Sequence, residues 1–354
     1  MQERSIYDSL ILSASDGYSS LKKHIESDTF SDVFLLMDSN TVEFCRDDFF
    51  YKLNPDRPIQ EIEVEPGESC KDIDVVKHLW SELAECRASR KSLLINLGGG
   101  SVCDLGGFVA STYMRGISYI NVPTTLLAMI DAAYGGKTAI DFSGVKNLIG
   151  TFYAPEMILL DTEYTATLEE RHFVGAFGEI FKYGLILDNG LWAELKEKFP
   201  DGIDFHLEKW VERCLQLKRS IVAKDPLDNG LRRILNAGHT IGHALEAFHL
   251  DKQDELYHGE AIAWGLIAEL FIAHRLRGFD HVELELFKKI VQKHIQRPSV
   301  SQDDTDILLE YIYLDKKTVN SSVFMPIVES PGVCIPQLEV APELVSEALI
   351  YMLT

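Results

Sequence analysis

Residues 92–107, SLLINLGGGSVCDLGG, decide the fold of the first half of the chain. An apolar run ends at Leu97 and passes directly into Gly98-Gly99-Gly100, and an apolar pattern with two further glycines follows. This order predicts a buried strand, a tight turn and a helix, because glycines let backbone N–H groups approach phosphate oxygens at a helix N-terminus. The spacing is not GxGxxG, so a turn that binds no ligand explains it equally well.

Four further apolar runs surround this stretch and alternate with longer helical patterns. They lie at residues 32–37, 62–64, 117–122 and 157–160. Short apolar runs between helices are typical of a largely parallel sheet covered on both faces. We therefore predict an N-terminal Rossmann-like parallel-sheet domain of the α/β class over residues 1–165.

The apolar spacing changes to three and four residues after about Leu168, which predicts helices. The predicted fold is therefore α/β followed by all-α, with a mainly helical domain over residues 166–354. The predicted helical domain ends with a strand and a connection within residues 323–340 and a last helix over residues 342–353. We expect that strand to pack onto the first domain. The other predicted helices span residues 179–187, 191–199, 207–222, 235–248, 260–277 and 284–295.

The composition limits the classes of partner. Thirty-four Lys and Arg against 55 Asp and Glu give a net charge of −21, which disfavours binding to nucleic acid or to an anionic membrane surface. The six cysteines form no CxxC pair and indicate reduced thiols. Neither a signal core at the N-terminus nor an uninterrupted apolar run of membrane length is present. We predict a cytoplasmic protein whose anionic ligands are held by a local cationic pocket.

A second glycine-rich segment carries lysines. Residues 123–131, PTTLLAMID, are followed by Gly135-Gly136-Lys137-Thr138 and by Lys146-Asn147. Lysine supplies flexible donors and Asp131 can accept from sugar hydroxyls, so this segment predicts a clamp for phosphate and hydroxyl groups. The first glycine and the spacer of a P-loop are missing, which excludes a nucleotide hydrolase of that type.

The helical half carries histidines at helical spacing. Arg232, Asn236, His239 and His243 would form one stripe if the segment is helical throughout, and their chemistry suits a pocket wall better than a core seam. His258 opens another apolar helix. A carboxylate and two imidazoles with an open fourth position suit a catalytic zinc, although any single histidine can also be a surface or core residue. A zincin is excluded, because Thr240 stands where HExxH needs Glu.

Taken in order, these motifs resemble the 3-dehydroquinate synthase family of the sugar-phosphate cyclase group. The resemblance runs from about Asp38 to Lys317. Its most specific pieces are Gly98-Gly99-Gly100, Arg115-Gly116, residues 123–131, Gly135-Gly136-Lys137-Thr138, residues 146–150, Glu179 with Lys182-Tyr183-Gly184, Gly230-Leu231-Arg232, residues 235–244 and His258-Gly259-Glu260.

The resemblance implies roles for individual residues. It implies that Glu179, His239 and His258 are the metal ligands and that they bind zinc or cobalt. The catalytic residues are Lys137, Lys182, His243 and Asp131, with His243 in the phosphate pocket. NAD would contact Asp38, Asn40, Glu68, Lys71, Gly98, Gly99, Gly100, Asp104, Thr124 and Thr125. The substrate would contact Arg115, Lys146, Asn147, Lys218, Arg232, Asn236 and one of Lys316 or Lys317.

The implied reaction converts 3-deoxy-D-arabino-heptulosonate 7-phosphate into 3-dehydroquinate and phosphate, in the shikimate pathway. It passes through transient oxidation by NAD, phosphate elimination, re-reduction, ring opening and an intramolecular aldol closure, with no net redox change. Lys218 and Arg232 would bind the substrate carboxylate. The resemblance also implies a homodimer in which Arg115 reaches into the neighbouring subunit.

Three other interpretations compete with this one. A cyclase of the same group that acts on sedoheptulose 7-phosphate has no need of Lys218 and Arg232, because that substrate lacks a carboxylate. A zinc- and NAD-dependent polyol dehydrogenase needs fewer phosphate-directed cations and would accumulate NADH. A homologue that keeps the fold only for binding or assembly would be expected to have lost ligands, and none of the expected ligands is lost.

The chain departs from the family pattern at a few positions. Ala132-Ala133 stands where Ser-Ser is frequent, Gly178 precedes Glu179 where Ala is usual, and Asp228 replaces a longer Glu near Arg232. Asn320 and the two serines after it replace a glycine that usually follows the late lysines. None of these changes removes an expected metal ligand or carboxylate anchor.

Overall fold

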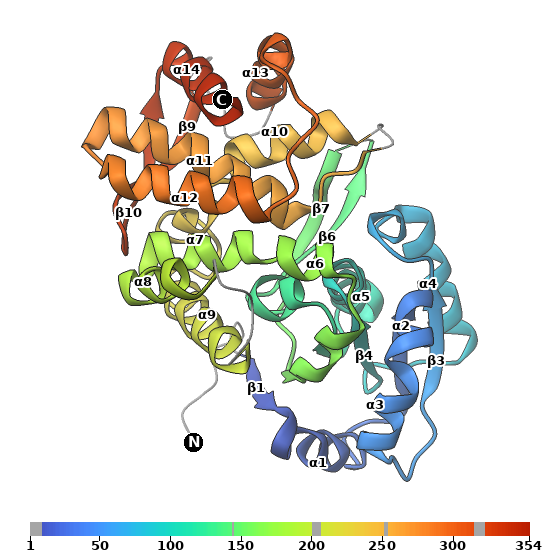
Figure 1. The fold of residues 1–354 in the computed structure, drawn as a ribbon. Coiled ribbons are helices and arrows are strands. Elements are labelled where there is room, and N and C mark those ends of the chain that lie inside the picture. The colour runs from blue at the N-terminus through green and yellow to red at the C-terminus, as the bar shows by residue number, and fades with distance from the viewer. Residues whose placement is uncertain (1–8, 144, 200–206, 251–253, 315–322) are drawn as a thin grey trace. The chain divides into compact units, whose positions relative to one another are not determined.

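The computed structural model describes residues 9–143, 145–199, 207–250, 254–314 and 323–354 (Figure 1). The chain divides into two compact units, residues 1–168 and 169–354, against the predicted division after residue 165.

A six-stranded parallel sheet forms the centre of the first unit, in the order β1-β8-β5-β4-β2-β3. The parallel arrangement and five of the strands confirm the sequence prediction. The first strand was missed, because its four residues stand alone before a helix. The strands are β1 (Leu10–Ser13), β2 (Val33–Asp38), β3 (Gln60–Val64), β4 (Leu93–Gly98), β5 (Ser118–Pro123) and β8 (Met157–Leu160).

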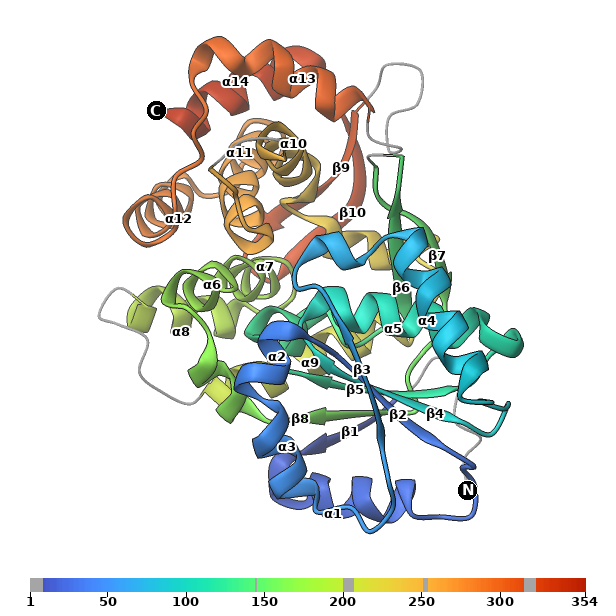
Figure 2. The same cartoon turned by 90° about the vertical axis from the view of Figure 1, so that its right-hand side faces the viewer.

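Helices cover the two faces of this sheet, with α4 and α5 on one side and α1 on the other (Figure 2). The core beneath α4 and α5 joins Phe34 and Leu36 of β2, Leu94 of β4, Leu79 of α4 and Leu105 of α5. Burial of these apolar side chains is the main force that holds the layers together. The helices are α1 (Ala14–Ile25), α2 (Ser39–Phe44), α3 (Arg46–Leu53), α4 (Ile73–Glu85) and α5 (Gly100–Thr112).

The glycine-rich stretch forms the predicted strand, turn and helix, with β4 ending at Gly98 and α5 beginning at Gly100. A Cβ on Gly106 would overlap the buried side chain of Asn96, so α5 packs on β4 with no room for a side chain there. Asn96 in turn donates to the Asn121 side chain of β5 at 2.9 Å. The turn leaves the sheet between β4 and β2, where the strand order reverses, which is where ligands bind in open parallel sheets.

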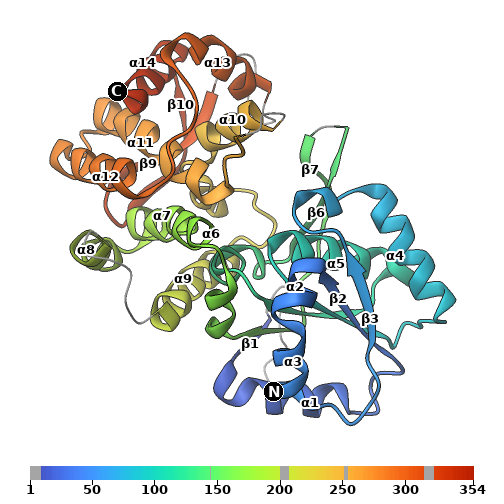
Figure 3. The ribbon, with the colours of Figure 1, turned by 45° about the vertical axis from the view of Figure 1, so that its right-hand side comes forward.

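The lysine-bearing segment after β5 is an antiparallel hairpin that the sequence analysis missed. Strands β6 (Lys137–Phe142) and β7 (Val145–Phe152) pair with each other and form a ribbon of their own (Figure 3). Their polar residues conceal the period-two pattern of a strand, and Phe142, Val145 and Phe152 are exposed.

The second unit is mainly helical, as predicted. Its central helix, α11 (His258–Arg277), is buried from Gly259 to Leu270 and contacts α7, α10, α12 and α14. A helix that is apolar on every side is expected in such a central position. The other helices are α6 (Glu170–Gly175), α7 (Phe177–Leu187), α8 (Asn189–Lys198), α9 (Leu207–Val222), α10 (His239–His249), α12 (His281–His294), α13 (Thr305–Leu314) and α14 (Pro342–Leu353).

Two expectations for this unit are wrong. The late strand β9 (Val323–Ser330) pairs with β10 (Val333–Val340) of the same unit instead of joining the first sheet. Residues 235–248 are not one helix, because a 3₁₀ turn over Leu231–Asn236 ends before Ala237, which is extended, and Gly238, at φ +80°. The stripe from Arg232 to His243 is therefore broken, and of its four members only His239 and His243 share a helix.

No helix within the described ranges is both long and apolar enough to span a bilayer.

Candidate metal and cofactor sites

Three predicted metal ligands lie together in the second unit. Glu179 comes from α7, His239 is the first residue of α10 and His258 is the first residue of α11. The Nε2 atoms of both histidines are 3.5 Å from Oε1 of Glu179, and the three ligand atoms lie within 4.8 Å of one another. Glu179 is fully buried, whereas the His258 side chain is 31% exposed, so the cluster is open on one side.

Glycines set this geometry, because one stands beside each of the three ligands. A Cβ on Gly178 would overlap the carbonyl oxygen of Gly259, and a Cβ on Gly259 would overlap that of Gly175. Gly238 faces α11 equally closely, since a Cβ on Gly265 would overlap its carbonyl oxygen. The backbones around α7, α10 and α11 therefore touch where the ligands emerge, and Gly178, a departure from the family pattern, has a packing reason.

The charges of the cluster favour a bound cation. Neither carboxylate oxygen of Glu179 accepts a hydrogen bond within the described residues, although the Lys182 ammonium contacts Oε2. A buried carboxylate without hydrogen bonds is costly. Donor atoms bound about 2.0–2.1 Å from a tetrahedral metal are roughly 3.3 Å apart, close to the 3.5 Å separations of Oε1 from the two ring nitrogens. The residues present therefore fit a small divalent metal.

Each histidine has a hydrogen-bond partner for its other ring nitrogen. Nδ1 of His239 is 3.1 Å from the carbonyl oxygen of Ala237, and Nδ1 of His258 is 3.3 Å from Oε2 of Glu246. Without a metal, burial opposes the charged form of His258, but Glu246 and Glu179 outweigh it and raise its pKa to about 10. Both rings can present Nε2 to a metal when Nδ1 carries the proton.

A second set of ligand atoms overlaps the first. His243, Glu246 and His258 also lie within 4.8 Å of one another, and His258 belongs to both sets. Glu246 was not predicted as a site residue, because an acidic residue on an amphipathic helix is usually exposed. Its spacing of seven from His239 was the available signal, since residues two turns apart share a helix face.

Three buried cations belong to the same unit. The side chains of Lys182, Lys218 and Arg232 are at most 5% exposed. The segment before Arg232 is held by Asp225, which accepts backbone N–H bonds from Gly230 at 2.7 Å and Arg232 at 3.0 Å. Burial opposes the charge of Asp225, but these bonds hold its pKa below the ordinary value. Asn236 ends the 3₁₀ turn that carries Arg232.

The residues expected to bind the cofactor gather at one edge of the first unit's sheet. Asp38 ends β2, Glu68 and Lys71 follow β3, and Gly98-Gly99-Gly100 and Thr124-Thr125 follow β4 and β5. Carboxyl ends of parallel strands lie at the same edge. Asp38 also caps α2, accepting from the backbone N–H of Thr41 at 2.8 Å, and Asn40 is exposed in that helix.

Lys71 is the buried centre of this edge. Its Nζ lies 3.0 Å from Asp104, 3.4 Å from Glu68 and 2.5 Å from the Asn147 side-chain oxygen. Burial opposes its charge, but Asp104 and Glu68 outweigh burial and raise the pKa of Lys71. The lysine therefore stays charged and ties the edge of the sheet to β7.

The remaining expected site residues have exposed or partly exposed positions in the first unit. Asp131 lies in a single π-helical turn after β5, Lys137 begins β6, and Lys146 lies in β7. Arg115 is exposed in a loop with left-handed backbone, at φ +69°. Lys316, Lys317 and Asn320 lie outside the described residues.

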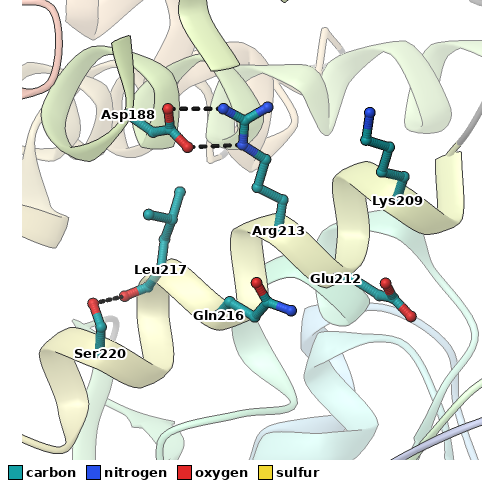
Figure 4. A pocket seen from close by; sticks show the side chains of 7 residues that line it. All are labelled: Asp188, Lys209, Glu212, Arg213, Gln216, Leu217 and Ser220. Carbon is teal, nitrogen blue, oxygen red and sulfur yellow. Dashed lines mark hydrogen bonds and ion pairs between the residues drawn. The ribbon is translucent and has the colours of Figure 1, made fainter. Parts of the chain in front are cut away.

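A separate depression on α9 contains none of the expected site residues (Figure 4). It contains a bidentate pair, in which Arg213 donates to Asp188 at 2.7 and 2.8 Å. Because Asp188 also caps α8, the pair ties α8 to α9 and acts as a structural link. Its lining residues are Asp188, Lys209, Glu212, Arg213, Gln216, Leu217 and Ser220.

Comparison with known proteins identifies similar sequences over most of the chain. Residues 61–175 match the family model "3-dehydroquinate synthase N-terminal", and residues 176–318 match "3-dehydroquinate synthase C-terminal". The 3-dehydroquinate synthase of Alkaliphilus oremlandii (strain OhILAs) is 38% identical over 299 residues, covering 84% of this chain and 81% of the relative. That of Parabacteroides distasonis is 34% identical over 336 residues, covering 94% of each.

A solved structure shares the fold of both units. The crystal structure of 2-deoxy-scyllo-inosose synthase complexed with carbaglucose-6-phosphate, NAD+ and Co2+ has a TM-score of 0.82 and 25% identity, covering 96% of each chain.

The close packing of α11 predicts that one added methyl group at Gly259 lowers both the stability of the protein and its affinity for zinc. Gly259→Ala should destabilise the protein by about 1–3 kcal/mol, because the new Cβ overlaps a carbonyl oxygen, and should weaken zinc binding roughly tenfold or more by displacing His258. Urea unfolding and competition with a chromogenic chelator measure the two effects. Gly190→Ala is the control, since its Cβ would meet only side-chain atoms, at the ends of Arg213 and Asp188. Wild-type zinc affinity in Gly259→Ala would contradict this account of the cluster.

Proposed function

Because the chain belongs to the 3-dehydroquinate synthase family, we propose that it converts 3-deoxy-D-arabino-heptulosonate 7-phosphate into 3-dehydroquinate and phosphate. The observation that carries the proposal is the cluster of Glu179, His239 and His258, with Lys182 in contact with Glu179 and with Lys218 and Arg232 buried in the same unit. The reaction is a phosphate elimination followed by closure of a carbocycle, with the transient oxidation reversed before the product leaves. It would serve the shikimate pathway.

The three clustered side chains would hold one zinc ion. One carboxylate and two imidazoles are donors that zinc prefers, and they leave a fourth position for a substrate oxygen. Cobalt accepts similar donors, and Co2+ is present in the 2-deoxy-scyllo-inosose synthase structure. When bound, the metal polarises the substrate hydroxyls and NAD serves as a reversible hydride acceptor.

The carboxyl edge of the first unit's sheet would hold NAD. The turn over Gly98, Gly99 and Gly100 precedes the N-terminus of α5, where N–H groups and the helix dipole favour the pyrophosphate. A Cβ on Gly99 would come within 3.2 Å of Thr125, so side chains would fill the cradle. The other proposed contacts are Asp38, Asn40, Glu68, Lys71, Asp104, Thr124 and Thr125.

The chain's own cations would bind the two acidic groups of the substrate. Lys218 and Arg232 are proposed for the carboxylate, because two buried cations favour a buried anion. Lys182 and Asp131 would orient the hydroxyls by hydrogen bonds. The phosphate would contact Lys137, Lys146, Asn147, Asn236, His243 and one of Lys316 or Lys317, and Lys137 and His243 would stabilise its charge as it leaves.

The assembly and location are part of the same proposal. We propose a cytoplasmic homodimer in which Arg115 reaches the neighbouring subunit's substrate. The exposure of Arg115 and the left-handed backbone of Met114 and Arg115 support this role, since strained loops are frequent at binding sites.

The proposed reaction has a distinctive stoichiometry. Metal-replete protein with NAD and 3-deoxy-D-arabino-heptulosonate 7-phosphate should release one phosphate per dehydroquinate, with no accumulation of NADH, as measured by coupled assays. His239→Ala should abolish turnover, because a metal ligand is lost. Net NADH production would favour a polyol dehydrogenase and contradict the proposal. Turnover of sedoheptulose 7-phosphate alone would do the same, because that substrate lacks the carboxylate.

Substitutions at Arg232 and at its neighbour Arg233 test the proposed binding of the substrate carboxylate. Arg232→Gln should lower kcat/KM by roughly 30-fold or more, since loss of one partner of a buried charge pair costs about 2–5 kcal/mol. The zinc affinity should not change, because Arg232 is not a metal ligand. Arg233→Gln is the matched control, because Arg233 is exposed. Equal steady-state kinetics in the two variants would contradict the assignment of Arg232.

A further inference from the structure

Glu246 lies directly behind one of the proposed metal ligands. Its Oε2 is 3.3 Å from Nδ1 of His258, and Nε2 of the same ring is 3.5 Å from Glu179. The Glu246 side chain is 7% exposed. It lies two turns after His239 on α10, on the helix face that carries that ligand. Burial of a carboxylate charge is costly, so we expect an interaction at this position to offset that cost.

The structure offers two overlapping sets of metal ligands, and Glu246 belongs to only one of them. In the set with Glu179 and His239, His258 uses Nε2; in the set with His243 and Glu246, its Nδ1 faces the carboxylate. A neutral imidazole has one lone pair and one N–H, so it can bind a metal through only one nitrogen and donates through the other.

Three observations favour Nε2 as the metal-binding atom. Glu179 is fully buried and neither of its oxygens accepts a hydrogen bond in the described part of the chain. The other nitrogen of His239 already lies 3.1 Å from the Ala237 carbonyl oxygen, which leaves Nε2 of that ring to face Glu179. His243, in contrast, is exposed. The proton of His258 is then on Nδ1, and it points at Glu246.

We propose that Glu246 is a positioning residue for the metal site, accepting the Nδ1–H hydrogen bond of His258. This bond fixes the tautomer and the orientation of a ring that is otherwise partly open to solvent. The negative charge of Glu246 also increases the basicity of the imidazole and so strengthens the metal bond. The inference rests on the metal site of the proposed function, and it assigns the two histidines different acceptors: a neutral carbonyl for His239 and a carboxylate for His258.

Zinc affinity of the full chain tests this role without relying on turnover. Zinc dissociation constants are measured by competition with a chromogenic chelator, and the visible spectrum of the Co2+ form reports the ligand field. Glu246→Gln keeps the size and removes the charge, whereas Glu246→Asp keeps the charge and withdraws the carboxylate from the ring. Glu283→Gln is the matched control, a partly buried carboxylate that accepts from Trp192 at 2.7 Å, away from the cluster. Thermal unfolding of the metal-free proteins checks that every variant is folded.

A positioning role predicts an ordered set of affinities. Glu246→Gln and Glu246→Asp should each bind zinc roughly 10- to 100-fold more weakly than wild type, with an altered Co2+ spectrum. Glu283→Gln should stay within about twofold of wild type, in line with the small effects of changes away from the ligands. His243→Ala should still bind zinc, because His243 is outside the ligand set, and His239→Ala should not bind zinc measurably.

Four outcomes would overturn the inference. Wild-type affinity in Glu246→Gln would remove the role and leave the metal site intact, and wild-type affinity in Glu246→Asp would show that charge alone matters. Loss of binding in His243→Ala and Glu246→Gln, with retention in Glu179→Gln, would place the metal in the other set. Absence of zinc binding in the wild type would remove the metal site of the proposed function, and this inference with it.

Discussion

The close approach of three backbones in the second unit is the constraint on which the proposed chemistry depends. Glycines beside Glu179, His239 and His258 remove the side chains that would separate α7, α10 and α11. Two of the ligands are also the first residues of their helices, so small shifts of a helix end would move them. Among the described residues, neither oxygen of the buried Glu179 carboxylate accepts a hydrogen bond, although the Lys182 ammonium contacts one of them, and this makes the cluster suited to a cation.

Several cations are buried in this chain although its net charge is strongly negative. The net charge is −21, yet Lys71, Lys182, Lys218 and Arg232 are all buried. Desolvation of isolated cations is unfavourable, so buried cations imply nearby anions. At Lys71 these anions are carboxylates of the protein itself, Asp104 and Glu68. In the second unit Lys182 contacts Glu179, and the proposed substrate would add a carboxylate and a phosphate as further anions.

Much of this organisation could be predicted from the sequence, and the failures have physical causes. Apolar runs predicted five strands of the parallel sheet, and the resemblance to the 3-dehydroquinate synthase family predicted the cluster of Glu179, His239 and His258 that the structure brings together. The break at Gly238 was missed, because helical spacing continues across it and the positive φ that the packing requires leaves no trace in periodicity. Glu246 was missed because burial of an acidic residue depends on a partner from another helix. The roles of the clustered residues remain predictions.

The position of the bound metal tests the account most directly. Crystals of the zinc-loaded protein, with anomalous diffraction collected at the zinc absorption edge, would locate it. The account predicts one strong peak about 2.0–2.2 Å from a Glu179 oxygen and from Nε2 of both His239 and His258. A peak among His243, Glu246 and Nδ1 of His258, or no peak within the second unit, would contradict it.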